Sequence, residues 1–274
     1  MAELSRQIFP VGNARIEVIL GGSGQPIVCT THPIEGAGVQ RCRWHAQHAR
    51  AVGVMPRGIE GSSPAHGKEE LSTERLIQDM EAVRRSLGYQ RWVVEGYSGG
   101  CTVALAYALS YPHALEGLIV GFGAANYRDM SRESRSILSP AYPAYQQMLA
   151  NAARQLETAP ETENHHWQQL ADQLWVLIRE QQPAIMLPGT PNEHLTAYLE
   201  YIGSFDVCAR LRDIRVPTLV VCGRHDPLIP TDMCLELHRG IPGAELLLLE
   251  QSGHGVSEAE MELFHDTVKG FLSP

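Results

Sequence analysis

The chain has 274 residues, 44% of them hydrophobic, and a formal net charge of -9 with a pI near 5.7. This length and composition fit one large α/β domain, or a core domain with a modest insertion. The acidic balance argues against nucleic acid and against an anionic membrane surface as partners, because both require a basic footprint.

Small neutral or cationic ligands stay open as partners. No basic and apolar leader-like run opens the sequence, and no segment approaches the roughly 20 apolar residues that span a bilayer. We therefore expect a cytoplasmic protein, a monomer or a homodimer, whose partner is a small-molecule substrate. The six cysteines show no CxxC pair and no zinc-type spacing, which favours buried free thiols over a structural disulfide.

The first half of the chain alternates between predicted strands and predicted helices. Short apolar runs predict strands at 7–9, 16–20, 26–30, 51–55, 92–94 and 118–122. Helices are predicted at 40–50, from a Ser72 cap to Gly88, and at 102–110. Because parallel neighbours need crossover helices, this alternation predicts a doubly wound, mostly parallel α/β sheet.

The pattern changes at about residue 126. No clear strand is predicted as far as residue 205, and helical stretches rich in Trp and Leu alternate there with proline-containing loops. Strands return at 216–222 and 244–249, with helices between and after them. We therefore predict an α/β core formed by residues 1–125 and 206–274, with a helical cap inserted over residues 126–205.

A serine surrounded by small residues follows the predicted strand at 92–94. The run Gly96-Tyr97-Ser98-Gly99-Gly100 matches the G-x-S-x-G nucleophile elbow, in which the serine sits on a strained turn between a strand and a helix. Small neighbours are needed because the turn brings backbone segments close together. The five residues alone are a weak signal, but the strand before them and the helix after them make Ser98 a candidate nucleophile.

A serine hydroxyl needs a positioned base, so the motif predicts partners further along the chain. Asp226 lies in the loop after the predicted strand at 216–222, and is the candidate acid. His254 follows the last predicted strand and is flanked by glycines, which makes it the candidate base. All three residues lie beyond the carboxyl ends of predicted strands, where open α/β sheets place their sites.

With these motifs the sequence resembles the α/β-hydrolase superfamily, in particular capped serine hydrolases of the proline iminopeptidase and esterase or lactonase type. The resemblance covers the chain apart from the cap, and its family order Ser, Asp, His implies a triad of Ser98, Asp226 and His254. Its motifs are GYSGG, GRHDPLIP, SGHG, and MPRGIEGS, which is similar to a D-x-R-G-x-G-x-S loop with Met55 in place of aspartate.

The resemblance also implies an oxyanion hole with two backbone donors. One is the N–H of Gly99, at the start of the helix after the nucleophile. The family takes the other from a His-Gly-x loop, but this chain has His32 followed by Pro33, which has no N–H; counting two residues past the histidine gives Ile34. His32 and Tyr97 are candidate substrate-binding residues, although a rigid loop at His32 and packing beneath the cap at Tyr97 stay open.

The predicted function is hydrolysis of a small ester or lactone, with an amide as a further option, and it requires no cofactor. The histidines and acids near 157–166 have no second cluster at ligand spacing, so no metal site is predicted. A proline iminopeptidase-like aminopeptidase is an alternative, in which Glu193 and Glu200 could bind the substrate amine. A non-hydrolytic lyase or a ligand receptor of the same fold also stays open, because the cap sets the substrate.

Overall fold

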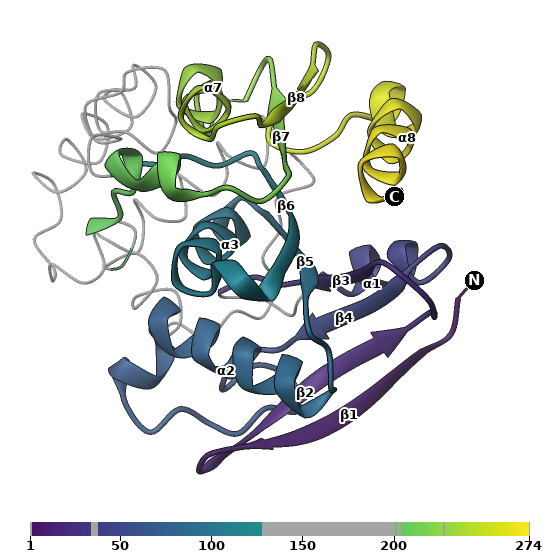
Figure 1. Cartoon of the computed structure of the whole chain (residues 1–274), viewed down its shortest axis with the longest axis vertical. Coiled ribbons are helices and arrows are strands. Elements are labelled where there is room, and N and C mark those ends of the chain that lie inside the picture. The colour runs from purple at the N-terminus through teal and green to yellow at the C-terminus, as the bar shows by residue number, and fades with distance from the viewer. Residues whose placement is uncertain (1, 34–37, 128–200, 202–203, 227, 274) are drawn as a thin grey trace, which may run out of the picture.

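A computed structural model describes residues 2–33, 38–127, 201, 204–226 and 228–273. Within these ranges an eight-stranded sheet has the order β1-β2-β4-β3-β5-β6-β7-β8 (Figure 1). The first three strands in that order pair antiparallel and all later neighbours pair parallel. The predicted mostly parallel α/β sheet is therefore confirmed. The strands are β1 (Leu4–Val11), β2 (Ala14–Gly21), β3 (Ile27–Thr30), β4 (Arg50–Val54), β5 (Trp92–Tyr97), β6 (Leu115–Gly121), β7 (Thr218–Gly223) and β8 (Glu245–Leu249).

Helices cover both faces of the sheet. In Figure 1, α1 and α8 lie on one side of the sheet, and α2, α3 and α7 lie on the other. The described helices are α1 (Val39–His45), α2 (Thr73–Ser86), α3 (Gly99–Ser110), α7 (Thr231–Gly240) and α8 (Met261–Leu272), with 3-10 turns η1 (Lys68–Leu71), η2 (Pro112–Ala114), η4 (Cys208–Asp213) and η5 (Glu258–Glu260). None of these helices is long and apolar enough to cross a membrane.

The central strands are mostly apolar because each of their faces contacts a helix layer. Val93 and Val94 are neighbours in β5, yet they pack in two different buried clusters, since successive strand residues point to opposite faces. Val94 belongs to the cluster on the α2 and α3 side. Val93 packs with Phe264 and Val268 of α8.

Local signals place the ends of α2 correctly. The Ser72 side chain accepts a hydrogen bond from Arg75 N at 3.1 Å, so the helix begins at Thr73 as the cap predicts. Gly88 follows the helix with a φ of 74°, a left-handed conformation that suits glycine. A capping hydrogen bond and a left-handed glycine, both predicted from the sequence, therefore mark the two ends of this helix.

Two predicted helix boundaries are wrong. The helix predicted to reach residue 50 ends at His45, because Arg50 must already pair with Ile27 in the neighbouring strand β3. The helix predicted to begin at residue 102 begins at Gly99, because Ser98 leads directly into it and its carbonyl accepts from Cys101 N at 2.9 Å. The pairing of β3 with β4 therefore sets the end of α1, and the turn at Ser98 sets the start of α3.

The predicted helical cap, residues 126–205, lies almost entirely outside the described residues. At its two ends, Tyr127 N donates to Phe205 O at 3.0 Å and Val207 N donates to Ala125 O at 2.8 Å. The chain between β6 and β7 therefore leaves the core and rejoins it at one place. The helical content of the cap stays a prediction.

An aromatic cluster joins α1 to α8. The Trp44 ring stacks on His265 with centroids 4.4 Å apart, and contacts His48 edge-on at 4.4 Å. Burial lowers the pKa of His48 to about 4, and the charges of His45, Lys269 and Arg41 act in the same direction. The folded protein therefore favours the neutral His48 ring.

We expect this histidine to make the fold sensitive to mild acid. The unfolded chain takes up the His48 proton near pH 6.5, whereas the folded chain does so only near pH 4. The contribution of the neutral His48 ring to the free energy of unfolding is thus fully present above pH 6.5. It is lost as the pH falls from 6.5 to 4. The decrease in melting temperature between pH 7 and pH 4.5 should be smaller in His48→Phe, which keeps the ring packing, than in the wild type.

The matched control for this measurement is His66→Phe, which replaces an exposed histidine. Its melting temperature should fall with pH as steeply as that of the wild type. An equal pH dependence in His48→Phe and the wild type would show that His48 does not contribute.

Candidate active site

Ser98 forms the turn between β5 and α3. Its φ of 52° and ψ of -123° are unusual for a residue with a side chain, and such strained conformations persist only where the surroundings fix them. Here Ser98 N donates to Gly121 O at 3.0 Å, and the Ser98 carbonyl accepts from the first turn of α3. The turn predicted from the G-x-S-x-G pattern is therefore present and is bonded on both sides.

Two glycines allow this turn to form. A Cβ on Gly96 would lie 2.1 Å from Gly100 O, and a Cβ on Gly100 would lie 2.5 Å from Thr31 O. The first contact lets α3 pack directly on β5. The second brings the loop after β3 against the first turn of α3, where backbone N–H groups have no acceptor within the helix. Gly99 N–H belongs to this first turn.

The three predicted triad residues form one hydrogen-bonded chain. His254 Nε2 lies 2.8 Å from Ser98 Oγ, and His254 Nδ1 lies 2.8 Å from Asp226 Oδ2. The side chains of His254 and Asp226 are 8% and 2% exposed. Ser98, Asp226 and His254 follow β5, β7 and β8, so the carboxyl edge of the sheet brings them together from distant parts of the sequence.

The surroundings of Asp226 orient the imidazole. Asp226 Oδ1 accepts hydrogen bonds from Leu228 N at 2.8 Å and from Ile229 N at 2.9 Å, while Oδ2 contacts the ring of His254. Because a carboxylate can only accept, Nδ1 of His254 carries the proton and donates it to Asp226. Nε2 is then left to accept a proton from Ser98 Oγ. This arrangement can activate a serine hydroxyl as a nucleophile.

Of the predicted residues in the loop after β3, the structure describes His32 but not Ile34. Ile34, the predicted second oxyanion donor, is outside the described residues. The Nδ1 atom of His32 is buried and has no hydrogen-bond partner in the described part of the chain. Burial lowers the pKa of His32 to about 4, and the charge of His254 acts in the same direction. His32 is therefore a neutral imidazole near the predicted base.

The hydroxyl of Tyr97 forms a hydrogen bond inside the protein. Its hydroxyl donates to Glu95 Oε1 at 3.0 Å, and its ring packs against Phe122 and Phe264 with centroids 5.9 Å away in each case. The ring therefore lies on the α8 side of the sheet, directly before the nucleophile. A role for Tyr97 in substrate binding stays a prediction.

Comparison with known proteins identifies the family. The family model described as "alpha/beta hydrolase fold" matches residues 40–260. The chain belongs to the α/β-hydrolase fold family. The expected superfamily is therefore confirmed over most of the chain.

Relatives of this α/β-hydrolase fold protein have names that refer to different substrates. A Pseudomonas savastanoi pv. phaseolicola protein named "Putative carbamate hydrolase RutD" is 30% identical over 229 residues, which are 78% of this chain and 80% of that protein. A 2-hydroxy-6-oxo-6-phenylhexa-2,4-dienoate hydrolase of Comamonas testosteroni is 27% identical, covering 92% and 88%. A proline iminopeptidase of Arabidopsis thaliana is 25% identical, covering 81% and 67%.

Solved structures agree on the fold. An α/β fold family hydrolase from Bacillus anthracis str. Sterne superposes with a TM-score of 0.79 at 24% identity, covering 98% of this chain and 99% of that one. A proline iminopeptidase from Mycobacterium smegmatis gives a TM-score of 0.67 at 21% identity, covering 98% and 97%. These identities are low, so the likeness establishes the shared α/β-hydrolase architecture.

A buried charged cluster next to the elbow was missed by the sequence interpretation. Glu95, three residues before Ser98, is 2% exposed. Its carboxylate accepts from Arg41 Nε at 3.1 Å and from Arg41 Nη2 at 2.5 Å, and lies 2.9 Å from His45 Nε2. Together with the Tyr97 hydroxyl, these groups form what we call the Glu95 cluster. An acidic residue inside the apolar run of β5 was the available signal.

The Glu95 cluster keeps its carboxylate ionised. Burial alone would raise the pKa of Glu95, but the charges of Arg41 and His45 and their hydrogen bonds hold it well below its ordinary value. The guanidinium of Arg41 also lies over aromatic rings, 4.6 Å from the Trp44 centroid and 4.9 Å from that of Phe264. The cluster thus joins α1, β5 and α8 beneath the elbow.

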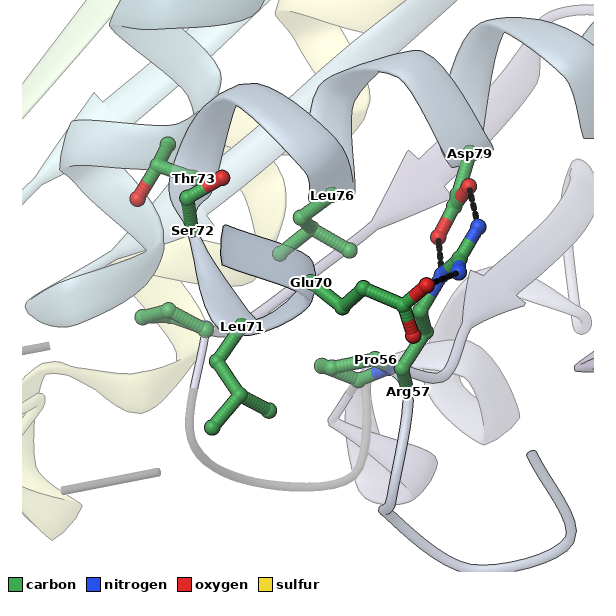
Figure 2. A pocket seen from close by; sticks show the side chains of 9 residues that line it. Pro56, Arg57, Glu70, Leu71, Ser72, Thr73, Leu76 and Asp79 are labelled. Carbon is green, nitrogen blue, oxygen red and sulfur yellow. Dashed lines mark hydrogen bonds and ion pairs between the residues drawn. The ribbon is translucent and has the colours of Figure 1, made fainter. Parts of the chain in front are cut away.

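The loop that resembles D-x-R-G-x-G-x-S has a structural role. Arg57 donates two hydrogen bonds to Asp79 of α2, at 2.8 and 3.0 Å, and contacts Glu70 at 3.1 Å (Figure 2). None of the triad residues lines the hollow beside this ion pair. Its lining residues are Pro33, Pro56, Arg57, Glu70, Leu71, Ser72, Thr73, Leu76 and Asp79.

Near the elbow, the described residues include neither a reactive cysteine nor a metal site. Cys101, three residues after Ser98, is fully buried in α3, and burial raises the pKa of its thiol well above the ordinary value. A thiol in that state is a poor nucleophile. The structure describes all six cysteines, none of them forms a disulfide, and Cys208 is the one that is not fully buried. In the ranges that the structure describes, no group of His, Cys, Asp and Glu side chains is arranged to hold a metal ion.

Proposed function

We propose that this protein is a serine hydrolase that cleaves a small ester or lactone through an acyl-enzyme. The observation that carries the proposal is the hydrogen-bonded chain from Ser98 Oγ through His254 to Asp226, with both links at 2.8 Å. This chain combines a nucleophile, a base and a group that orients the base. It lies at the carboxyl edge of the sheet, where α/β folds place their sites.

In the first half of the reaction, Ser98 Oγ attacks the substrate carbonyl carbon while His254 Nε2 takes its proton. Asp226 stabilises the imidazolium that forms. The negative charge on the carbonyl oxygen is stabilised by the N–H of Gly99, with Ile34 N–H as the second donor expected from the sequence. When the tetrahedral intermediate collapses, His254 gives the proton to the leaving alkoxide, and the acyl group remains on Ser98.

In the second half, His254 takes a proton from water while the water oxygen attacks the acyl carbonyl carbon. Collapse of this intermediate releases the carboxylic acid, and Ser98 Oγ regains its proton from His254. The proton balance closes within the triad, so the reaction consumes one water and requires no redox partner.

The triad and the names of relatives support the proposed substrate class. Esters and lactones fit the chemistry directly. The relatives named proline iminopeptidase and carbamate hydrolase make an amide-type bond the second candidate. The acidic residues expected to bind an N-terminal amine, Glu193 and Glu200, lie outside the described residues, so the aminopeptidase alternative is left to experiment.

Ser98→Ala should abolish esterase activity. Removing the nucleophile of a triad lowers kcat by about 10⁴-fold or more. The measurement is the burst and steady-state release of p-nitrophenol from p-nitrophenyl acetate, together with labelling by a fluorophosphonate probe mapped by mass spectrometry. We expect a covalent adduct on Ser98 in the wild type and neither reaction in the variant.

The control is Ser86→Ala, which replaces an exposed serine at the end of α2 and should behave as the wild type. A wild-type protein inert to both reagents would refute the serine-hydrolase proposal. Prolyl-naphthylamide, assayed beside short-chain esters and lactones, separates the candidates: hydrolysis of the amide alone would favour the aminopeptidase.

A further inference from the structure

One carboxylate outside the triad links the two ends of the segment that carries the candidate base. We call residues 250–260 the His254 loop; it runs from the end of β8 through η5. At its far end, Glu260 Oε1 accepts from Glu250 N at 2.8 Å, and Glu260 Oε2 accepts from Gln251 N at 3.0 Å. Glu260 Oε2 also accepts from Ser252 Oγ at 2.7 Å. Glu260 therefore closes the loop around His254.

Ser252 links Glu260 to the backbone on the other side of His254. It is fully buried, and its Oγ accepts from Ser257 N at 2.9 Å while donating to Glu260. The two serines stand on either side of His254 in the sequence, so this pair of bonds sets the width of the loop. The loop reverses at the bridge between Gly253 and Gly255, which leaves His254 at its tip.

The same loop supports the candidate acid. His225 N, one residue before Asp226, donates to Ser252 O at 2.9 Å, and Arg224 N donates to Leu249 O at 2.9 Å. A shift of Ser252 would therefore move the backbone beside Asp226 as well as the backbone beside His254. Glu260 accepts hydrogen bonds from residues 250–252, and this is the segment that also contacts the loop of Asp226.

Glu260 is suited to this task because it is an ionised acceptor in a nearly closed environment. The residue is 7% exposed. Burial alone would raise the pKa of its carboxyl, but the hydrogen bonds from Ser252, Gln251 and Glu250 lower it below the ordinary value. At neutral pH both oxygens thus accept hydrogen bonds and donate none.

We propose that Glu260 is a positioning residue that fixes His254 relative to Asp226 and Ser98. The inference rests on the proposed function, since it assigns Glu260 to the geometry of that triad. A displacement of about 1 Å in a reacting group can cost on the order of 100-fold in rate. The hydrogen bonds of the Glu260 carboxylate go to residues of the loop and not to Ser98, Asp226 or His254.

Glu260→Gln tests the proposal because it keeps the shape and replaces one acceptor oxygen by an NH₂ donor. That donor faces N–H or O–H groups that also donate, so the loop must shift. We expect kcat to fall by about 10- to 100-fold, with KM changed by less than about twofold. The rate of fluorophosphonate labelling of Ser98 should fall by the same factor as kcat.

The matched control is Glu258→Gln, the same chemical change on an exposed residue of η5, which should leave kcat unchanged. Ser252→Ala is the second variant, should Glu260→Gln not fold. It removes the bond from Ser252 Oγ to Glu260 and the bond that Ser252 Oγ accepts from Ser257 N, and it keeps the two backbone bonds to Glu260, so a decrease in kcat is expected here too.

A spectroscopic measurement separates positioning from a purely structural role. The His254 Nδ1 proton, bonded to Asp226 at 2.8 Å, should give a downfield proton NMR signal in the wild type. In Glu260→Gln it should broaden through faster exchange with water at temperatures well below unfolding. A lower melting temperature with unchanged kcat and an unchanged signal would overturn the proposal.

The experiments distinguish a failure of the positioning role from a failure of the serine-hydrolase proposal. If the wild type were inert to esters and to fluorophosphonate, the serine-hydrolase proposal would fail, yet the NMR signal would still report whether Glu260 positions His254. If the wild type is active and Glu260→Gln equals it in both readouts, only the positioning role is refuted.

Discussion

Asp226→Asn is expected to lower kcat by about 10⁴-fold while leaving the fold intact. The asparagine oxygen can still accept from Leu228 N and Ile229 N, as Oδ1 of Asp226 does. The amide nitrogen then faces His254 Nδ1 and donates to it. The proton of the imidazole must move to Nε2, which can no longer accept the proton of Ser98.

This prediction is checked by kcat and KM for a p-nitrophenyl ester and by the melting temperature. KM and the melting temperature should stay close to the wild-type values, because the backbone bonds to residue 226 persist. The control is Asp266→Asn, which removes a carboxylate that is 68% exposed on α8 and should leave kcat unchanged. Activity of Asp226→Asn within tenfold of the wild type would contradict the role assigned to Asp226.

Glu95→Ala is expected to destabilise the protein by about 3–5 kcal/mol, the usual cost of removing one partner from a buried ion pair. The substitution leaves Arg41, His45 and the Tyr97 hydroxyl without their shared acceptor, at a place where the Glu95 and His45 side chains are almost fully buried. In a chain of this size, such a loss corresponds to a decrease in melting temperature of roughly 10 °C.

The measurement is the free energy of unfolding in urea, together with the melting temperature. Asp213→Asn removes the exposed ion pair of Arg210 and Asp213, whose atoms are 3.8 Å apart, and serves as the control. The double substitution Glu95→Leu with Arg41→Met should recover part of the loss, because it removes the buried charges together. A loss below about 1 kcal/mol in Glu95→Ala would show that water reaches the cluster.

The sequence was most informative where one short segment contains the whole signal. The elbow at Ser98 needs a strand before it, a helix after it and small neighbours, and all of these can be read within about a dozen residues. Asp226 and His254 each lie in the loop after a predicted strand. The α/β fold followed from the same alternation of strands and helices.

The sequence was least informative where two distant segments meet. Glu95 and Arg41 are 54 residues apart, and neither shows which partner it has. Glu260 resembles an ordinary acidic residue before a helix, and the bonds that it accepts from Glu250 N, Gln251 N and Ser252 Oγ depend on where β8 ends. The end of α1 at His45 is likewise set by pairing between β3 and β4. The predicted cap and Ile34 lie outside the described residues.

The order of the strands has a consequence for how the protein acquires its activity. Ser98 and His254 are 156 residues apart, and β5 lies inside the sheet whereas β8 lies at its edge. Contacts between such distant segments are slow to form during folding. A chain in which β1 to β6 have paired already contains the strained turn at Ser98 but has no base beside it. Recovery of activity during refolding therefore requires that β8 has paired with β7, since this pairing brings His254 beside Ser98.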